Sequence, residues 1–149
     1  MNKYRSHNCS EINENDEGKI VSLSGWLHRK RDHGNLLFID LRDHYGLTQC
    51  VIENKNKYFP ILEKIKPESV LNINGKVIKR EKGTENLELS TGKIEVSIQS
   101  VKVLSEAKEL PMPVFGEQDY PEDIRLKYRF IDLRRDEMHK NIILRSKII

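Results

Sequence analysis

The apolar residues between positions 19 and 104 recur mainly at every second position, the spacing that places them on one face of a β-strand. This alternation predicts five strands, at residues 19–28, 36–42, 47–53, 70–80 and 92–104. Between the third and the fourth, residues 54–65 change to the spacing of a helix, with apolar positions at Tyr58, Phe59, Leu62 and Ile65. The pattern therefore predicts five strands with a single helix between the third and the fourth.

This order is typical of a mainly β, five-stranded Greek-key OB-fold barrel, and it disfavours a parallel βαβ sheet because only one helix interrupts the strands. Residues 43–46, Asp-His-Tyr-Gly, predict a hairpin connection, with Gly46 at the position that takes a positive φ. The basic residues 29–31 are expected in the loop before the second strand. Residues 87–89 are expected to form a short additional β segment.

After Leu104 the pattern changes. Residues 106–121 contain three of the five prolines and no periodicity, which predicts a linker. Pro121 is followed by two acidic residues, as at the start of a helix, and a second helix is predicted from Asp136. We therefore expect an OB-fold domain over residues 1–105, a helical linker over 106–135, and the beginning of another domain over 136–149. The helical pattern reaches the last residue without a stop signal, so we interpret the chain as a fragment of a longer protein.

Composition excludes a membrane protein. Charged residues make up 33% of the chain and hydrophobic residues 37%, with a formal net charge of +3. Neither a signal peptide nor an apolar run of membrane-spanning length occurs, so we expect a cytoplasmic location and no membrane partner. Cys9 and Cys50 are too few for a disulfide framework and form no CxxC pair, so we interpret them as packing residues.

One ring and one amide on neighbouring predicted strands suggest a ligand. Phe38 and Gln49 can face the same molecule, and unstacked RNA bases are recognised by stacking on aromatic rings and by hydrogen bonds to their edges. Arg29, Lys30 and Arg31 add cations for phosphates or for a base edge. The residues thus favour a barrel that binds single-stranded nucleic acid. Two structural readings stay open: Phe38 fits a core position equally well, and a basic triplet is often a solvated surface.

Two stretches carry a more specific resemblance. Residues 25–50, GWLHRKRDHGNLLFIDLRDHYGLTQC, closely resemble the anticodon-binding barrel of bacterial aspartyl-tRNA synthetases, which are class II, subclass IIb enzymes. Residues 125–135, RLKYRFIDLRR, resemble the segment of that family between the barrel and the catalytic domain. The order and the spacing of the two stretches match, and the resemblance covers essentially the whole chain. Lysyl and asparaginyl synthetases share the barrel but depart from these motifs.

The resemblance implies roles for individual residues. Phe38 matches the phenylalanine that stacks on the central anticodon base, and Gln49 matches the glutamine that reads it. Arg31 is similar to the arginine that contacts the first anticodon base, Glu95 to a glutamate that helps to read the flanking bases, and Arg80 to a further anticodon contact. With the first residue of the basic triplet, the expected RNA-binding set is Arg29, Arg31, Phe38, Gln49, Arg80 and Glu95.

Two positions qualify this assignment. Ile78 stands where some family members carry a second arginine. In the RDxG loop, family members restricted to aspartate tRNA commonly have leucine and relaxed members often have histidine, and here the residue is His33. His33 is therefore a candidate specificity residue, and its presence implies that the parent enzyme also charges asparagine tRNA. The competing interpretation is that His33 is an ordinary loop residue.

The resemblance also implies what the chain lacks. The parent enzyme, a homodimer, would use ATP and Mg²⁺ to activate aspartate and would transfer it to tRNA(Asp), with tRNA(Asn) as a second substrate. Only the lead-in to its catalytic domain falls within residues 136–149, so we expect this chain to contain no catalytic residue, no metal ligand and no cofactor. Two alternatives remain: a general single-strand-binding OB module without anticodon preference, and a structural barrel whose basic tail packs against a partner domain.

Overall fold

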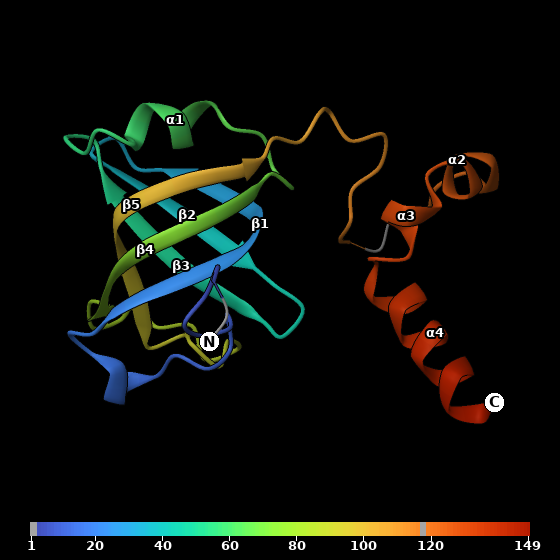
Figure 1. Ribbon diagram of the computed structural model, residues 1–149, viewed down its shortest axis with the longest axis horizontal. Coiled ribbons are helices and arrows are strands. Elements are labelled where there is room, and N and C mark those ends of the chain that lie inside the picture. Colours follow the sequence, from blue (N-terminus) through green and yellow to red (C-terminus); the bar gives the residue numbers. More distant parts are fainter. Residues whose placement is uncertain (1–2, 117–118) are drawn as a thin grey trace. The chain divides into compact units, whose positions relative to one another are not determined.

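The structure is a computed structural model that describes residues 3–116 and 119–149. The chain divides into two compact units, Met1–Lys108 and Glu109–Ile149. The first unit is a closed five-stranded barrel with a short helix after the third strand, which confirms the predicted fold class (Figure 1). Its elements are η1 (Glu14–Asp16), β1 (Ile20–Asp32), β2 (Leu36–Arg42), β3 (Leu47–Glu53), α1 (Phe59–Lys64), β4 (Val70–Lys79) and β5 (Ile94–Ser105).

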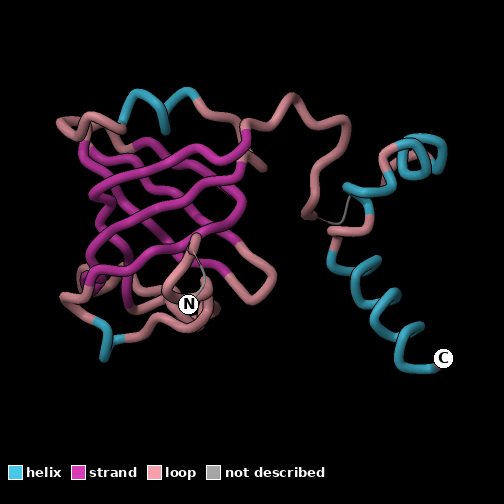
Figure 2. Tube along the Cα trace, viewed as in Figure 1, coloured by secondary structure: helices cyan, strands magenta, loops and turns pink. Residues whose placement is uncertain are grey.

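The barrel closes in the order β1-β2-β3-β5-β4, with β3 and β5 parallel and the other neighbours antiparallel. Figure 2 shows the strands of the barrel in magenta, with α1 in cyan at one end. The long strand β1 pairs with β4 from Ile20 to Trp26 and with β2 from Trp26 to Asp32. A register shift follows Leu27, where β1 has left β4 and continues along β2. Gly25 lies where a side chain would collide with the backbone carbonyl of Arg42, so only glycine lets β1 and β2 approach so closely there.

The core consists of every second strand residue, as the alternation predicted. Phe59 and Leu62 of α1 belong to the same cluster, which explains the helical spacing of the apolar residues in that segment. The strand residues that fill the barrel include Leu23, Leu27, Leu37, Ile39, Leu41, Ile52, Leu71, Ile73, Val77, Ile94 and Val96. Because this face of each strand is buried, the residues between them must face outward.

Three local predictions were wrong. Residues 29–31 lie in β1 rather than in a loop, because β1 continues to pair with β2 beyond its bulge. Residues 87–89 form a turn, in which the backbone N–H of Leu89 donates to the carbonyl of Asn86 at 3.2 Å, and no ladder forms. The helix begins at Phe59 rather than at residue 54, because the Asn56 side chain accepts a hydrogen bond from the N–H of Tyr58 at 3.0 Å and turns the chain.

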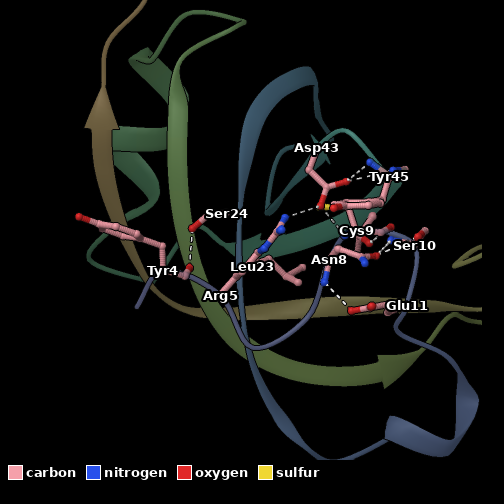
Figure 3. Close-up of polar contacts among 12 residues, drawn as sticks. Tyr4, Arg5, Asn8, Cys9, Ser10, Glu11, Leu23, Ser24, Asp43 and Tyr45 are labelled. Carbon is pink, nitrogen blue, oxygen red and sulfur yellow. Dashed lines mark hydrogen bonds and ion pairs between the residues drawn. The ribbon is translucent and has the colours of Figure 1, made fainter. Parts of the chain in front are cut away.

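The hairpin between β2 and β3 is present, but Gly46 does not have the predicted positive φ. It is instead a close-packing position, because a Cβ there would lie 2.9 Å from the Cβ of Ser10. The N-terminal segment covers this turn: one Asp43 oxygen accepts from the N–H of Cys9 at 2.9 Å and from Arg5 at 3.5 Å (Figure 3). Its other oxygen accepts from the N–H groups of Tyr45 and Gly46, so Asp43 joins the N-terminal segment to the hairpin.

The second unit contains α2 (Glu122–Lys127), α3 (Arg129–Asp132) and α4 (Asp136–Ile148), so helices begin close to Pro121 and at Asp136 as predicted. Met112 and Val114, from the segment interpreted as a linker, are buried with Ile131 in a small core. The predicted boundaries after residues 105 and 135 stay predictions. None of the helices formed by residues 3–116 and 119–149 combines the length and the apolar character needed to cross a membrane.

The buried alternation predicts a large difference between two isoleucines of the same sheet. Ile73 is fully buried, with 0% of its surface exposed, whereas Ile20 is 69% exposed. Ile73→Ala should lower the free energy of unfolding by about 2–5 kcal/mol, because it leaves a cavity in the barrel. Ile20→Ala should change it by less than about 0.5 kcal/mol. Urea unfolding followed by Trp26 fluorescence measures both, and equal losses would contradict the assignment of the two faces.

Candidate nucleic-acid interface

The outward face of β1, β2 and β3 forms a groove with a volume of about 770 Å³. Cross-strand pairing explains which residues line it: Arg29 of β1 lies opposite Asp40 of β2, and Asp40 lies opposite Gln49 of β3. Residues two positions away on each strand share the same face. The connection between β1 and β2, the segment between β4 and β5, and the start of β5 complete the lining. It comprises His28, Arg29, Arg31, His33, Leu36, Phe38, Asp40, Leu47, Gln49, Val51, Arg80, Glu81, Thr84, Asn86, Glu88, Leu89 and Glu95.

All seven residues predicted for RNA binding or specificity are therefore brought to one groove. They come from β1, the connection between β1 and β2, β2, β3, the residue that follows β4, and β5. The structure shows where these seven residues lie. That they contact RNA stays a prediction. The seven are Arg29, Arg31, His33, Phe38, Gln49, Arg80 and Glu95.

A chain of hydrogen bonds joins the polar residues in the middle of the groove. The Arg31 guanidinium donates through Nη2 to Asp40 Oδ1 at 2.9 Å and to Gln49 Oε1 at 3.0 Å. The Gln49 amide in turn donates through Nε2 to Glu95 Oε2 at 2.7 Å. The amide of Gln49 thus has an arginine on one side and a carboxylate on the other, and only 9% of the residue is exposed.

Phe38 is half-buried on the groove face, between the buried Leu37 and Ile39 that point into the core. Of the two readings of this residue, the geometry favours a position on the binding face over one in the core. The ring of His33 meets the ring of Phe38 edge-on, with centroids 5.3 Å apart and planes at 89°. A face of an aromatic ring in such a position can stack on a planar ligand.

Arg80 closes the groove from the end of β4. Its Nε donates to the carbonyl of Ile94 at 3.1 Å and its Nη1 to the carbonyl of Thr84 at 3.4 Å. Its Nη2 is buried and has no hydrogen-bond partner within the described part of the chain. Burial lowers the pKa of Arg80, and the carboxylates of Glu95 and Asp40 oppose this shift. A donor in this environment is suited to an acceptor on a ligand.

Lys30, the central residue of the basic triplet, does not face the groove. Its ammonium donates to three backbone carbonyls at the end of α1, those of Leu62 at 3.3 Å, Glu63 at 2.6 Å and Ile65 at 2.7 Å. The expectation that it serves phosphates or a base edge is therefore wrong. Alternation along β1 separates it from Arg29 and Arg31, and Lys30 instead satisfies carbonyls that a helix end leaves without partners.

Asp40 was not predicted as a site residue. It is 8% exposed and lies between Phe38 and the end of the strand on the groove face. Burial raises the pKa of Asp40, while the charges of Arg31, Arg29 and Arg80 lower it in that order. The two-residue period from Phe38 could have placed its side chain in the groove. Alternation alone assigns Asp40 to the outward face of the strand. It does not show that the groups around Asp40 bury this side chain.

Comparison with known proteins identifies the barrel. Residues 21–104 match the family model described as the OB-fold nucleic acid binding domain. The chain belongs to this family. In this OB-fold domain, the match covers β2, β3 and β4 in full, β1 except its first residue and β5 except its last.

Relatives of this OB-fold domain are larger enzymes. The chain is 64% identical over 149 residues to "Aspartate--tRNA(Asp/Asn) ligase" of Pelagibacter ubique (strain HTCC1062), covering 100% of this chain and 25% of that protein. It is 57% identical, with the same coverage, to the protein of that name in Beijerinckia indica subsp. indica. The solved asparaginyl-tRNA synthetase from Pyrococcus horikoshii superposes with a TM-score of 0.72 at 27% identity, over 86% of this chain and 28% of that one.

These comparisons confirm the resemblance to aspartyl-tRNA synthetases that the motifs indicated. The chain spans about a quarter of the length of the curated relatives it matches.

The contacts of Lys30 predict a structural role that its neighbours in the triplet do not share. Lys30→Met should lower the free energy of unfolding by about 1–3 kcal/mol, because three carbonyls lose a charged donor. Lys55→Met, which removes an exposed lysine near the same helix, is the matched control and should be nearly neutral. Urea unfolding measures both, and a neutral Lys30→Met would contradict the capping role.

Proposed function

We propose that this chain binds the anticodon loop of tRNA, as the anticodon-binding domain of an aspartate–tRNA ligase, and that tRNA(Asp) is its ligand. One observation carries the proposal: the ring of Phe38 and the amide of Gln49 share one groove face, and Arg31 and Glu95 contact opposite ends of that amide. A stacking platform beside an oriented amide is the combination that selects one unstacked base.

The groove supplies each part of such recognition. Phe38 would stack on a base without selecting it, which contributes about 1–3 kcal/mol per base. Gln49 would select the base through its edge, since an amide offers both a donor and an acceptor. Arg29 is exposed and available to phosphates. The Nη2 of Arg80 is buried and has no hydrogen-bond partner among the described residues, so a shift of the Arg80 side chain would let it donate to an acceptor of a neighbouring nucleotide.

The longer enzyme in which this domain would work is also a proposal. We infer that it is a cytoplasmic homodimer that activates aspartate with ATP and Mg²⁺ and esterifies it to tRNA(Asp). The relatives are named for both aspartate and asparagine tRNA, and His33 lies against Phe38, which supports tRNA(Asn) as a second ligand. ATP and Mg²⁺ would bind outside this chain, and no step of that chemistry is assigned to its residues.

A second candidate function is general binding of single-stranded nucleic acid. The basic residues of the groove favour it, because contacts to phosphates carry no sequence information. Asp40 and Glu95 argue against it, since buried or half-buried carboxylates in a groove weaken a purely electrostatic attraction. The two functions differ in whether the loop sequence matters.

Gln49→Ala tests the choice between them. Labelled anticodon stem-loops carrying GUC, GUU or a scrambled loop are titrated by fluorescence anisotropy at two salt concentrations. Wild type should bind GUC at least about tenfold tighter than the scrambled loop, or 1.4 kcal/mol. Gln49→Ala should remove most of this difference, because Ala offers neither donor nor acceptor.

The matched control is Gln99→Ala, which removes an exposed glutamine from β5 and should leave the preference unchanged. If all three loops bind alike and added salt abolishes binding, the chain is a general nucleic-acid module and the anticodon proposal is wrong.

His33→Leu tests the relaxed choice of tRNA. GUC and GUU differ only in the third base, so wild type should bind the two loops within about threefold of each other. In His33→Leu the ratio should shift toward GUC, because leucine cannot hydrogen-bond to a base. His44→Leu is the control, since His44 lies in the turn between β2 and β3 and does not line the groove. An unchanged ratio in His33→Leu would identify His33 as an ordinary loop residue.

A further inference from the structure

We propose that Asp40 is a positioning residue of the groove, which holds Arg31 so that the side-chain amide of Gln49 is fixed in one orientation before RNA arrives. This inference rests on the proposed function, because it assigns to Asp40 the ordering of the residue that reads the central base. Asp40 itself would touch no nucleotide.

The geometry makes Arg31 a bridge. A single nitrogen, Nη2 of Arg31, lies 2.9 Å from Asp40 Oδ1 and 3.0 Å from Gln49 Oε1. Asp40 and Gln49 are direct cross-strand partners in β2 and β3, so their backbones hold the two acceptors on the same face. The carboxylate therefore determines where the guanidinium lies, and the guanidinium then meets one end of the amide.

The orientation of the Gln49 amide follows from the character of its two partners. Arg31 has donors only, so the amide oxygen must face it, and Glu95 Oε2 is an acceptor, so the amide nitrogen must face that side at 2.7 Å. A reversed amide would oppose two donors at one end and two oxygens at the other. One N–H and one lone pair remain for a base that offers an acceptor beside a donor, as uracil does.

Arg31 needs a partner to stay in this place. Its side chain is 43% exposed, and a long, exposed side chain loses rotamer entropy when it is held in one conformation. The side chain of Asp40 is 11% exposed in the same ion pair, so the carboxylate is the fixed member. Without it, Arg31 would be held by the neutral Gln49 oxygen and could turn to solvent or to a phosphate.

Asp40 orders Arg31 in the groove, but its burial opposes folding. A raised pKa means that the folded state binds a proton at Asp40 more tightly than the unfolded state does. The ionised carboxylate therefore opposes folding at any pH above its unfolded pKa, fully so above its folded pKa, and this penalty disappears as the pH falls. The groups that face it are the guanidinium groups of Arg31, Arg29 and Arg80, with Glu95 across the amide. A buried charge that does not stabilise the fold is consistent with a role in recognition.

Asp40→Asn separates a positioning role from a structural one. It preserves shape and removes the charge, so at neutral pH the melting temperature should stay within about 2 °C of wild type or rise. The preference for a GUC loop over a GCC loop, which changes only the central base, should nevertheless fall by at least about fivefold. In RNA-free protein, the side-chain amide protons of Gln49 should lose protection from solvent exchange in NMR spectra.

The matched control is Glu53→Gln, which also removes one negative charge but lies at the far end of β3, with an exposed side chain. Both variants attract phosphates more strongly than wild type, so a change in overall affinity alone has no bearing on positioning. Glu53→Gln should keep the wild-type preference for the central uracil and the wild-type Gln49 amide signals.

Each outcome of the Asp40→Asn experiment bears directly on the positioning role. A folded Asp40→Asn that keeps the GUC preference overturns the positioning role while the anticodon proposal stands. A melting temperature lowered by more than about 5 °C also overturns it, because Asp40 would then be a structural residue. If wild type itself does not distinguish GUC from GCC, the anticodon proposal and the positioning role fail together. That result is seen in the wild-type protein, so it differs from the two outcomes above, which concern the variant.

Discussion

Barrel closure depends on the length of β1, whose thirteen residues pair first with β4 and then with β2. The change of partner takes place around Trp26, where the absence of a side chain at Gly25 admits the backbone of Arg42. Beyond the bulge that follows Leu27, the last residues of β1 no longer belong to the β4 ladder and extend along β2. That extension carries Arg29 and Arg31 to the edge of the groove, so the geometry of the binding face follows from the way the barrel closes.

In the closed barrel, alternate residues of a strand face opposite sides, so the apolar and the polar side chains of the same strand are separated. Inward residues form one apolar cluster, and the outward residues of the same strands form a groove with arginines, carboxylates and one aromatic ring. The groove is not a uniformly basic surface, because Asp40 and Glu95 lie among its arginines. Such an arrangement gives up some attraction for phosphates and instead fixes the direction of hydrogen-bonding groups, which is what discrimination between bases needs.

Residues outside the groove hold its margins in place. Lys30 joins the end of β1 to α1 through three carbonyls, while its neighbours in the basic triplet line the groove. Asp43 ties the turn between β2 and β3 to the N-terminal segment, and Thr48 donates to the carbonyl of Cys9 at 2.8 Å on the same strand as Gln49. A binding face built on strands that are secured at both ends needs little rearrangement when a ligand arrives.

The sequence by itself determined the fold class and the limits of β2 and β3, because alternation in a sheet with one buried face specifies which side each residue takes. The family motifs, rather than composition, singled out Phe38 and Gln49 among many aromatic and amide residues. Only the tertiary structure decided that Lys30 caps a helix, that Gly46 packs against Ser10, and that Asp40 is buried between arginines. Each of these depends on a segment distant in the chain, and contacts between distant segments have no local signature in the sequence.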